Sequence, residues 1–374
     1  MELGLYTLSD LITDPKTGIQ MSARDRIDET IRAATLADQV GLDVFGVGEH
    51  HRLDFAVSSP AVILAAIAQA TNRIRLASAV TVLSAADPVR VFQDFSTVDL
   101  ISGGRAEIIA GRGVFTEPFP LFGFDLNDYD QLFSEKLDLL RKLSQTERIT
   151  WRGSFRSPLR DAEISPRPIQ KELPIWIGVG GTPQSAVRAG HLGLPMALAV
   201  LGGPITAIKS IVDLYREAGQ RAGHSFSNLK VSINSHAYIG EDARQARDFH
   251  RAFYQQYLTE AMPRGKRPLE LSPADFQSMT GPRTGLMIGS AQEMIDKIMQ
   301  EYELLHHDRF LAQIDVGRLP FREVAKAIER FGEKVAPVIK AETRNDTPKR
   351  TDAIQPPTSI GESLDEEELP VTRA

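Results

Sequence analysis

Eight apolar segments, each followed by a stretch with helical periodicity, alternate along most of the chain, and this alternation constrains the fold more than any other feature. The predicted strands are 2–8, 43–48, 74–83, 105–110, 173–181, 193–200, 230–240 and 309–317. Alternating strands and helices indicate a parallel sheet of the α/β class, and eight repeats favour a closed (β/α)8 barrel, the TIM barrel, over an open doubly wound sheet. In such barrels the active site lies at the carboxyl ends of the strands, so the residues that follow each strand are the candidates for function.

The barrel is expected to span residues 1–340 as one domain. Residues 150–172 are predicted to leave it as an excursion with one small hairpin. Residues 263–289 contain several prolines and glycines and no clear period. A compact domain seldom keeps such a loop unless it has a function, so we expect an inserted active-site lid. Residues 341–374 are polar, proline-rich and acidic near the end, and are predicted to form a disordered tail.

The composition argues against several classes of partner. The formal net charge of −6 and the absence of a basic stripe argue against nucleic acid and against an anionic membrane surface. The chain has no cysteine, which excludes disulfides, thiolate nucleophiles and cysteine zinc sites. With neither a signal peptide nor an 18-residue apolar stretch, the chain is expected to be cytoplasmic and to stay out of membranes.

Three polar residues, Glu49, His50 and His51, follow the second predicted strand. Neighbouring side chains on a strand face opposite sides, so the two histidines are not expected to share a metal ion unless the chain has already turned, and no metal site is predicted. A lone histidine is more often a packing residue than a catalyst. The place of the triplet at a strand end nevertheless favours a functional role.

Two groups that can bind an anion follow the fourth and fifth predicted strands. Arg112 stands between two glycines, which let a ligand come close to the backbone while the guanidinium grips a phosphate. The alternative is an arginine that caps a turn or pairs with a carboxylate. Gly180, Gly181, Thr182 and Ser185 lie at the start of the next helix, where backbone N–H groups and a hydroxyl favour an anion. Because these strands are neighbours in a barrel, both groups are expected to converge on one phosphate.

The chain resembles the bacterial luciferase-like family of flavin-dependent monooxygenases and related oxidoreductases over most of residues 1–340. The resemblance rests on several motifs in order: GLDVFGVGEHH at 41–51, ASAVTVLSAADPVR at 77–90, SGGRAEIIAGRG at 102–113, LFGFD at 121–125, GLPMALAV at 193–200 and IGSAQEMIDKI at 288–298.

The resemblance implies a reduced flavin, usually FMN, in the mouth of the barrel. Its ring would lie against Ala79 and Val80, where the family typically has a non-proline cis peptide. The phosphate would be held by the residues following the fourth and fifth strands: Arg112, Gly180, Gly181 and Ser185. His50 matches the family's active-site histidine, and Glu49 would line the same pocket as the second expected catalytic residue. By analogy, O2 adds to the reduced flavin to give a peroxyflavin that oxidises a small organic substrate, with His50 as acid or base.

The resemblance also implies partners and leaves alternatives. No G-x-G-x-x-G nicotinamide cradle follows a strand, so a separate flavin reductase is expected to supply reduced FMN. Members commonly dimerise through the helices after strands two and three, and a homodimer is expected. Gly111 replaces a luciferase cysteine and Pro118 a luciferase carboxylate, which argues against a long-chain aldehyde substrate. The alternatives are an F420-dependent oxidoreductase that transfers hydride and a non-catalytic flavin-binding protein.

Overall fold

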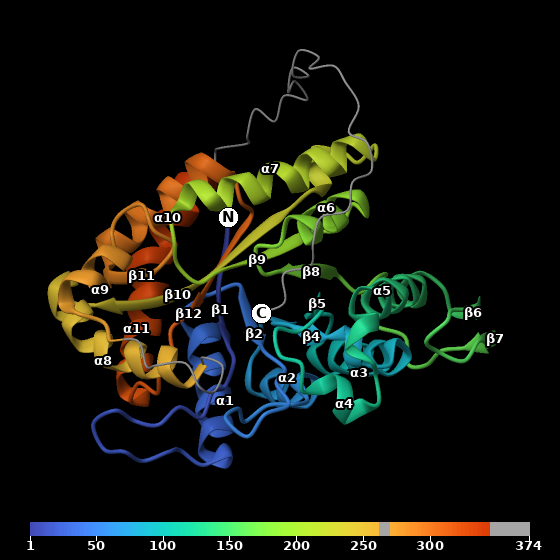
Figure 1. Cartoon of the computed structure of the whole chain (residues 1–374), viewed down its shortest axis with the longest axis horizontal. Coiled ribbons are helices and arrows are strands. Elements are labelled where there is room, and N and C mark those ends of the chain that lie inside the picture. The colour runs from blue at the N-terminus through green and yellow to red at the C-terminus, as the bar shows by residue number, and fades with distance from the viewer. Residues whose placement is uncertain (262–269, 345–374) are drawn as a thin grey trace.

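The fold is a closed barrel of eight parallel strands, as the alternation predicts (Figure 1). The computed structural model describes residues 1–261 and 270–344. In order around the barrel, the strands are β1 (Glu2–Thr7), β2 (Val44–Val47), β3 (Arg75–Ser78), β5 (Ala106–Gly111), β8 (Ile175–Val179), β9 (Met196–Val200), β10 (Val231–Gly240) and β12 (Arg309–Gln313). The sheet closes because β12 pairs in parallel with both β10 and β1.

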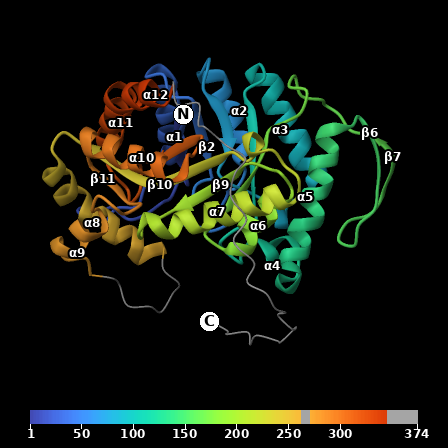
Figure 2. The same ribbon diagram turned by 90° about the horizontal axis from the view of Figure 1, so that it is seen from above.

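Helices surround the strands on the outside (Figure 2). They are α1 (Ala23–Gln39), α2 (Pro60–Ala70), α3 (Pro88–Ser102), α5 (Tyr129–Gln145), α6 (Pro183–His191), α7 (Ile205–Arg221), α8 (Ala243–Ala261), α10 (Ala291–Leu305), α11 (Phe321–Arg330) and α12 (Ala336–Arg344), the last two joined by a π-helical turn, η4 (Phe331–Val335). Residues 341–344 are therefore helical, and the prediction of a tail from residue 341 was wrong for them. The rest of that tail lies outside the described residues.

Several shorter elements lie outside the eight-stranded barrel and its main helices. They are β4 (Thr81–Val82), α4 (Pro118–Phe122), the hairpin β6 (Arg148–Trp151) and β7 (Leu159–Glu163), and the 3-10 turns η1 (Leu83–Ala85), η2 (Leu126–Asp128) and η3 (Phe226–Asn228). The hairpin is antiparallel, and it projects away from the barrel, in agreement with the predicted excursion (Figure 1).

Two regular elements lie in the segment 263–289, where no periodicity was expected: α9 (Pro273–Met279) and β11 (Met287–Ser290). Ser272 caps α9 by accepting a hydrogen bond from the backbone N–H of Asp275, and Phe276 is buried. β11 pairs in parallel with β10. The predicted absence of regular structure was therefore wrong for 270–289, while 263–269 lie outside the described part of the chain. The role of the segment as a lid stays a prediction.

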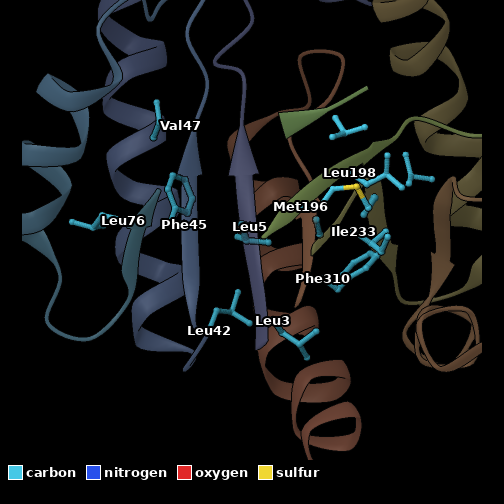
Figure 3. Packing of buried hydrophobic residues seen from close by; sticks show 14 of the residues in the cluster. Leu3, Leu5, Leu42, Phe45, Val47, Leu76, Met196, Leu198, Ile233 and Phe310 are labelled. Carbon is cyan, nitrogen blue, oxygen red and sulfur yellow. The ribbon is translucent and has the colours of Figure 1, made fainter. Parts of the chain in front are cut away.

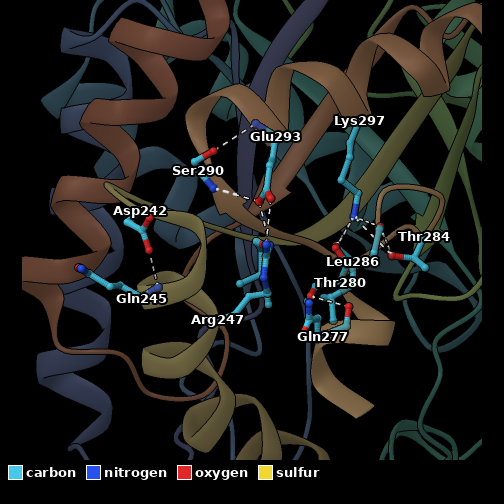
Figure 4. Close-up of polar contacts among 12 residues, drawn as sticks. Asp242, Gln245, Arg247, Gln277, Thr280, Thr284, Leu286, Ser290, Glu293 and Lys297 are labelled. Atoms are coloured by element: carbon cyan, nitrogen blue, oxygen red, sulfur yellow. Dashed lines mark hydrogen bonds and ion pairs between the residues drawn. The ribbon is translucent and has the colours of Figure 1, made fainter. Parts of the chain in front are cut away.

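Polar contacts fix this segment to its neighbouring helices (Figure 4). Arg247 of α8 donates to both carboxylate oxygens of Glu293 in α10, at 2.8 and 2.9 Å. Lys297, one turn further along α10, is buried and donates to the carbonyl oxygens of Gly281 at 2.9 Å and Leu286 at 2.7 Å. Because a buried ammonium is stable only when its donors are satisfied, Lys297 holds the chain between α9 and β11 against α10.

The side chains of each strand divide into two sets, as strand geometry requires. The outward set packs against the helices and forms the main core, which includes Leu3, Leu5, Phe45, Val47, Leu76, Met196, Leu198, Ile233 and Phe310 (Figure 3). The inward set fills the barrel and forms a second cluster, made of Tyr6, Val44, Ala77, Ile109, Trp176, Ala197 and Leu311. Because both faces are buried, most strands carry apolar residues on both faces, whereas β10 and β12 also carry buried polar residues.

A buried ion pair closes the amino-terminal end of the barrel. Arg309 of β12 and Glu107 of β5 face each other across the interior and are each 1% exposed. Two hydrogen bonds join the guanidinium to the carboxylate, at 2.6 and 3.2 Å, and a third reaches Glu2 at 2.8 Å. The guanidinium also lies 4.2 Å from the ring of Trp176. The bidentate geometry and the aromatic face satisfy the charge of the buried guanidinium.

We expect Arg309→Met to lower the free energy of unfolding by about 3–5 kcal/mol, because Glu107 is then left as a buried charge without its partner. Urea denaturation followed by far-UV circular dichroism would measure the change. The double variant Arg309→Met/Glu107→Met removes both charges and is expected to recover part of the loss. A single variant as stable as the wild type would show that the pair does not stabilise the barrel.

Candidate active site

A cavity of about 380 Å³ opens at the carboxyl ends of the strands. Its walls come from strand ends around the whole barrel and from the loop 113–118. Among the residues predicted from the sequence, Glu49, His50, Ala79, Val80, Arg112, Gly180, Thr182 and Ser185 line it. Gly181 does not belong to the lining: it is exposed and has a positive φ of 94°. The structure therefore brings eight of the nine predicted residues together around one cavity, with Gly181 outside its lining.

The peptide between Ala79 and Val80 is cis, as the resemblance implies. Two glycines make room for the side chain of Val80. A Cβ atom on Gly111 of β5 would lie 2.4 Å from Cγ2 of Val80, and one on Gly178 of β8 would lie 2.7 Å from Cγ1. Both distances are far below van der Waals contact, so neither position accepts a larger residue while Val80 keeps its place. The glycines next to Arg112 and in the fifth strand thus have a packing role that sequence reasoning missed.

Glu49, His50 and His51 all lie beyond the end of β2, where the chain has already turned. Both histidines line the cavity, so the expectation that strand geometry would keep them apart does not apply here. His51 donates from Nε2 to Glu49 at 2.9 Å. The other carboxylate oxygen of Glu49 accepts from the backbone N–H of Val82 at 3.0 Å. Glu49 therefore connects His51 to the strand end that carries the cis peptide.

Aromatic rings enclose His50. Its ring stacks on Phe55 with a centroid distance of 3.9 Å, and Phe115 approaches it edge-on at 5.6 Å. Its Nδ1 atom is buried and has no hydrogen-bond partner in the described part of the chain. Burial lowers the pKa of His50 to about 4, because the charged form loses its hydration among these rings. At neutral pH His50 is an uncharged imidazole with unused hydrogen-bonding capacity facing a cavity.

The two predicted anion-binding groups converge. Arg112 donates from Nη2 to the hydroxyl of Ser185 at 2.8 Å, across the gap between β5 and the start of α6. It also donates to Asp130 of α5 at 2.7 Å, and Arg188 of α6 donates to the same oxygen at 3.1 Å. Burial alone would raise the pKa of Asp130, but the hydrogen bonds from Arg188 and Arg112 outweigh it and lower that pKa below its ordinary value. Arg112 therefore has a carboxylate partner, which was the alternative considered from the sequence. It also contacts Ser185, as expected for a shared anion site.

The backbone near Ser185 is open. A Cβ atom on Gly180 or on Gly181 would have no heavy atom within 4 Å among the described residues. Thr182 is the N-cap of α6, and its side chain makes no capping hydrogen bond. Open space, a helix start and a neighbouring guanidinium fit the phosphate of an FMN molecule, which would compete with Asp130 for Arg112.

Sequence reasoning missed the polar residues on the far wall of the cavity. Asn234 and His236 of β10, Gln313 of β12 and Tyr6 of β1 point into the barrel, and Tyr257 of α8 joins them in the lining. A partial signal for them exists: Ser232, Asn234 and His236 stand two residues apart in one predicted strand, and Gln313 and Asp315 do so in another, which is the period of one strand face. Within residues 1–261 and 270–344, no group of three histidine or carboxylate side chains is placed to hold a metal ion.

The family model of the luciferase-like monooxygenases matches residues 1–308, and the chain belongs to this family. It is 23% identical over 368 residues to the oxygenase component of the flavin-dependent trigonelline monooxygenase of Acinetobacter baylyi, covering 90% of this chain and 95% of that protein. Relatives of this kind are enzymes, and the family includes both flavin-dependent monooxygenases and F420-dependent oxidoreductases.

Solved structures share the fold. The oxygenating constituent of 3,6-diketocamphane monooxygenase from Pseudomonas putida, in complex with FMN, superposes with a TM-score of 0.74 at 19% identity, covering 90% of this chain and 98% of that one. An F420-dependent secondary alcohol dehydrogenase superposes with a TM-score of 0.68 at 19% identity, also covering 90% of this chain and 98% of that one. Among the described helices, none is long and apolar enough to cross a membrane.

We expect Gly111→Ala to lower the free energy of unfolding by about 1–3 kcal/mol, because the new methyl group must displace Val80. Gly180→Ala is the matched control, since a Cβ atom there meets no described neighbour, and it is expected to change stability by less than about 0.5 kcal/mol. Replacing Val80 with alanine in the Gly111→Ala background should recover part of the loss. Thermal and urea unfolding would measure all three, and equal effects at positions 111 and 180 would contradict this account.

Proposed function

We propose that this chain is a monooxygenase that uses reduced FMN and O2 to oxidise a small organic substrate. The observation that carries the proposal is that one cavity connects the Arg112–Ser185 pair to the interior of the barrel. The pair matches a phosphate, and Ala79 and Val80 line the same cavity, so a flat ring bound there would lie against them. When bound, reduced FMN would supply the electrons that activate oxygen.

Different residues of the cavity would bind the phosphate, transfer a proton and position a neighbouring side chain. Arg112, Ser185 and the backbone at Gly180 and Thr182 would hold the phosphate. His50 would accept or hold a proton near the reacting atoms, since its imidazole is neutral and its Nδ1 has no described partner. Both oxygens of Glu49 are already engaged, so we assign Glu49 to positioning His51 rather than to catalysis. We propose this positioning role in place of the catalytic role expected for Glu49.

The enclosed setting of His50 suits this reaction. The rings of Phe55 and Phe115 keep water away from the imidazole, and water competes with a substrate for any oxidising species. The relative from Acinetobacter is named as an oxygenase component, which supports a separate reductase as the source of reduced FMN for this chain as well. The expected homodimer stays a prediction.

Binding of the cofactor tests the proposal directly. We expect the protein to bind reduced FMN more tightly than riboflavin under anaerobic conditions, because only FMN carries the phosphate. Arg112→Ala should weaken FMN binding by about tenfold or more and leave riboflavin binding nearly unchanged, the usual scale for a lost charged hydrogen bond. Fluorescence titration would measure both affinities, with Arg148→Ala in the distant hairpin as the matched loss of a positive charge.

Three outcomes of this titration are decisive. Equal weakening of FMN and riboflavin would remove Arg112 from the phosphate site. Tight binding of reduced F420, with no oxidation of the bound cofactor when oxygen is admitted, would move the assignment to F420-dependent hydride transfer. Binding of FMN with no oxygen consumption would leave a flavin-binding protein without monooxygenase activity.

His50→Ala is expected to lower turnover by at least about a hundredfold, the usual scale for a lost acid–base group, with little change in FMN affinity. The assay would use a small ketone or N-heterocycle that the wild-type protein oxidises. Because burial lowers the pKa of His50 to about 4, the wild-type rate should show no loss from protonation of His50 between pH 8 and pH 5. Unchanged turnover in the variant would exclude His50 from the mechanism.

A further inference from the structure

Two neighbouring strands present orphaned polar atoms to the cavity, opposite the cis peptide. His236 of β10 and Gln313 of β12 are register partners in the parallel sheet, so their side chains lie side by side. Both line the cavity, and they are 1% and 0% exposed. The Nε2 of His236 and both amide atoms of Gln313 are without a hydrogen-bond partner in the part of the chain that the structure describes. Buried polar atoms are rarely left unpaired, so these three atoms point to a ligand.

The hydrogen-bond network fixes the tautomer of His236. The hydroxyl of Tyr254 lies 3.3 Å from Nδ1 of His236 and 3.3 Å from the carbonyl oxygen of Leu201. A carbonyl can only accept, so both contacts are made at once only if the single phenolic hydrogen goes to Leu201 and the phenolic oxygen accepts from the Nδ1–H of His236, and we assign this tautomer. Burial lowers the pKa of His236 to about 4, so the ring carries one proton at neutral pH. Nε2 is therefore a bare hydrogen-bond acceptor facing the cavity, and Tyr254 is a positioning residue.

The geometry points to a recognition function for these two residues, which we call the β10–β12 pair. We propose that the β10–β12 pair binds the edge of a lactam or imide, with the ligand N–H donating to Nε2 of His236 and the adjacent carbonyl accepting from the amide of Gln313. Neither side chain is charged, so the pair suits a neutral ligand. The proposed edge pairs two of the three atoms, Nε2 of His236 and the amide nitrogen of Gln313, whereas an apolar ligand would leave all three unpaired, which discriminates strongly against it in a buried polar site.

This ligand edge has two chemical sources. The pyrimidine ring of a flavin carries an N–H group between two carbonyls, and a small neutral N-heterocyclic substrate can carry the same edge. The first source rests on the proposed function, whereas the second does not require a bound flavin. Each source is therefore probed with its own pair of ligands, in which one member has its N–H replaced by N–CH3.

The first arm compares FMN with 3-methyl-FMN, and the second compares 2-pyridone with N-methyl-2-pyridone. We expect the wild-type protein to prefer the N–H member of at least one pair by about tenfold or more, which is the scale of one lost hydrogen bond in a buried site. Preference in the first arm would assign the pair to the flavin, and preference in the second arm to the substrate. Fluorescence titration and ligand-detected NMR would measure the affinities.

Three variants test the residues. His236→Phe and Gln313→Leu keep the approximate size of each side chain and are expected to abolish the preference. Ser235→Ala is the matched control: Ser235 lies between Asn234 and His236 on β10, is buried, has an orphaned hydroxyl and is not part of the cavity lining. It should retain the preference. Absence of a preference in both arms, or its survival in both test variants, would overturn the proposal.

A second measurement on the wild-type protein does not depend on the variants folding. In ¹⁵N-histidine NMR, His236 should show a protonated Nδ1 and an unprotonated Nε2 at neutral pH, and Tyr254→Phe should alter that signature. The opposite tautomer in the wild type would overturn the assignment of His236 as an acceptor. Failure of the protein to bind any flavin would refute the proposed function alone, because the 2-pyridone arm would still test the pair.

Discussion

The inward side chains of the eight parallel strands fill the barrel at one end and leave a cavity at the other. The rest of this structure depends on the sizes of these inward side chains. At the amino-terminal end the barrel is filled by large groups: Arg309, Glu107 and Trp176 stack and pair across the interior. At the carboxyl end the inward positions of β8 and β9 carry small residues such as Gly178 and Ala197. The cavity is the space that these small residues leave, and the ion pair lies toward the opposite end of the barrel, outside the lining of the cavity.

Most of the barrel strands and several residues that line the cavity could be predicted from the sequence. Strong helical and strand periodicity marks long elements, so the eight barrel strands could be found, whereas α9 is short and lies among prolines and glycines. The approach of Arg112 to Ser185 could be inferred because adjacent strands of a barrel end side by side. His236 and Gln313 were missed because the face of a strand that points inward is fixed only when the barrel closes.

The two ends of the cavity differ in the charge of the side chains that line them. At the mouth, Asp130 holds the guanidinium groups of Arg112 and Arg188, so the cations are already oriented before any anion arrives. Preorientation lowers the entropic cost of binding, although an incoming phosphate must compete with the carboxylate. Deeper in the barrel, burial keeps His50 and His236 uncharged. A ligand with one anionic end and one neutral, polar end matches this gradient better than a uniformly charged one.

The contact between Val80 and the glycines at 111 and 178 links three positions that are far apart in the sequence. A luciferase cysteine stands where this chain has Gly111, but a side chain there would collide with Val80. In this structure the methyl groups of Val80 occupy the space that a side chain at position 111 or 178 would need, so the residues at these three positions constrain one another. A residue as large as cysteine at position 111 would therefore require a smaller residue than valine at position 80, so a thiol and a branched side chain cannot share this wall of the cavity.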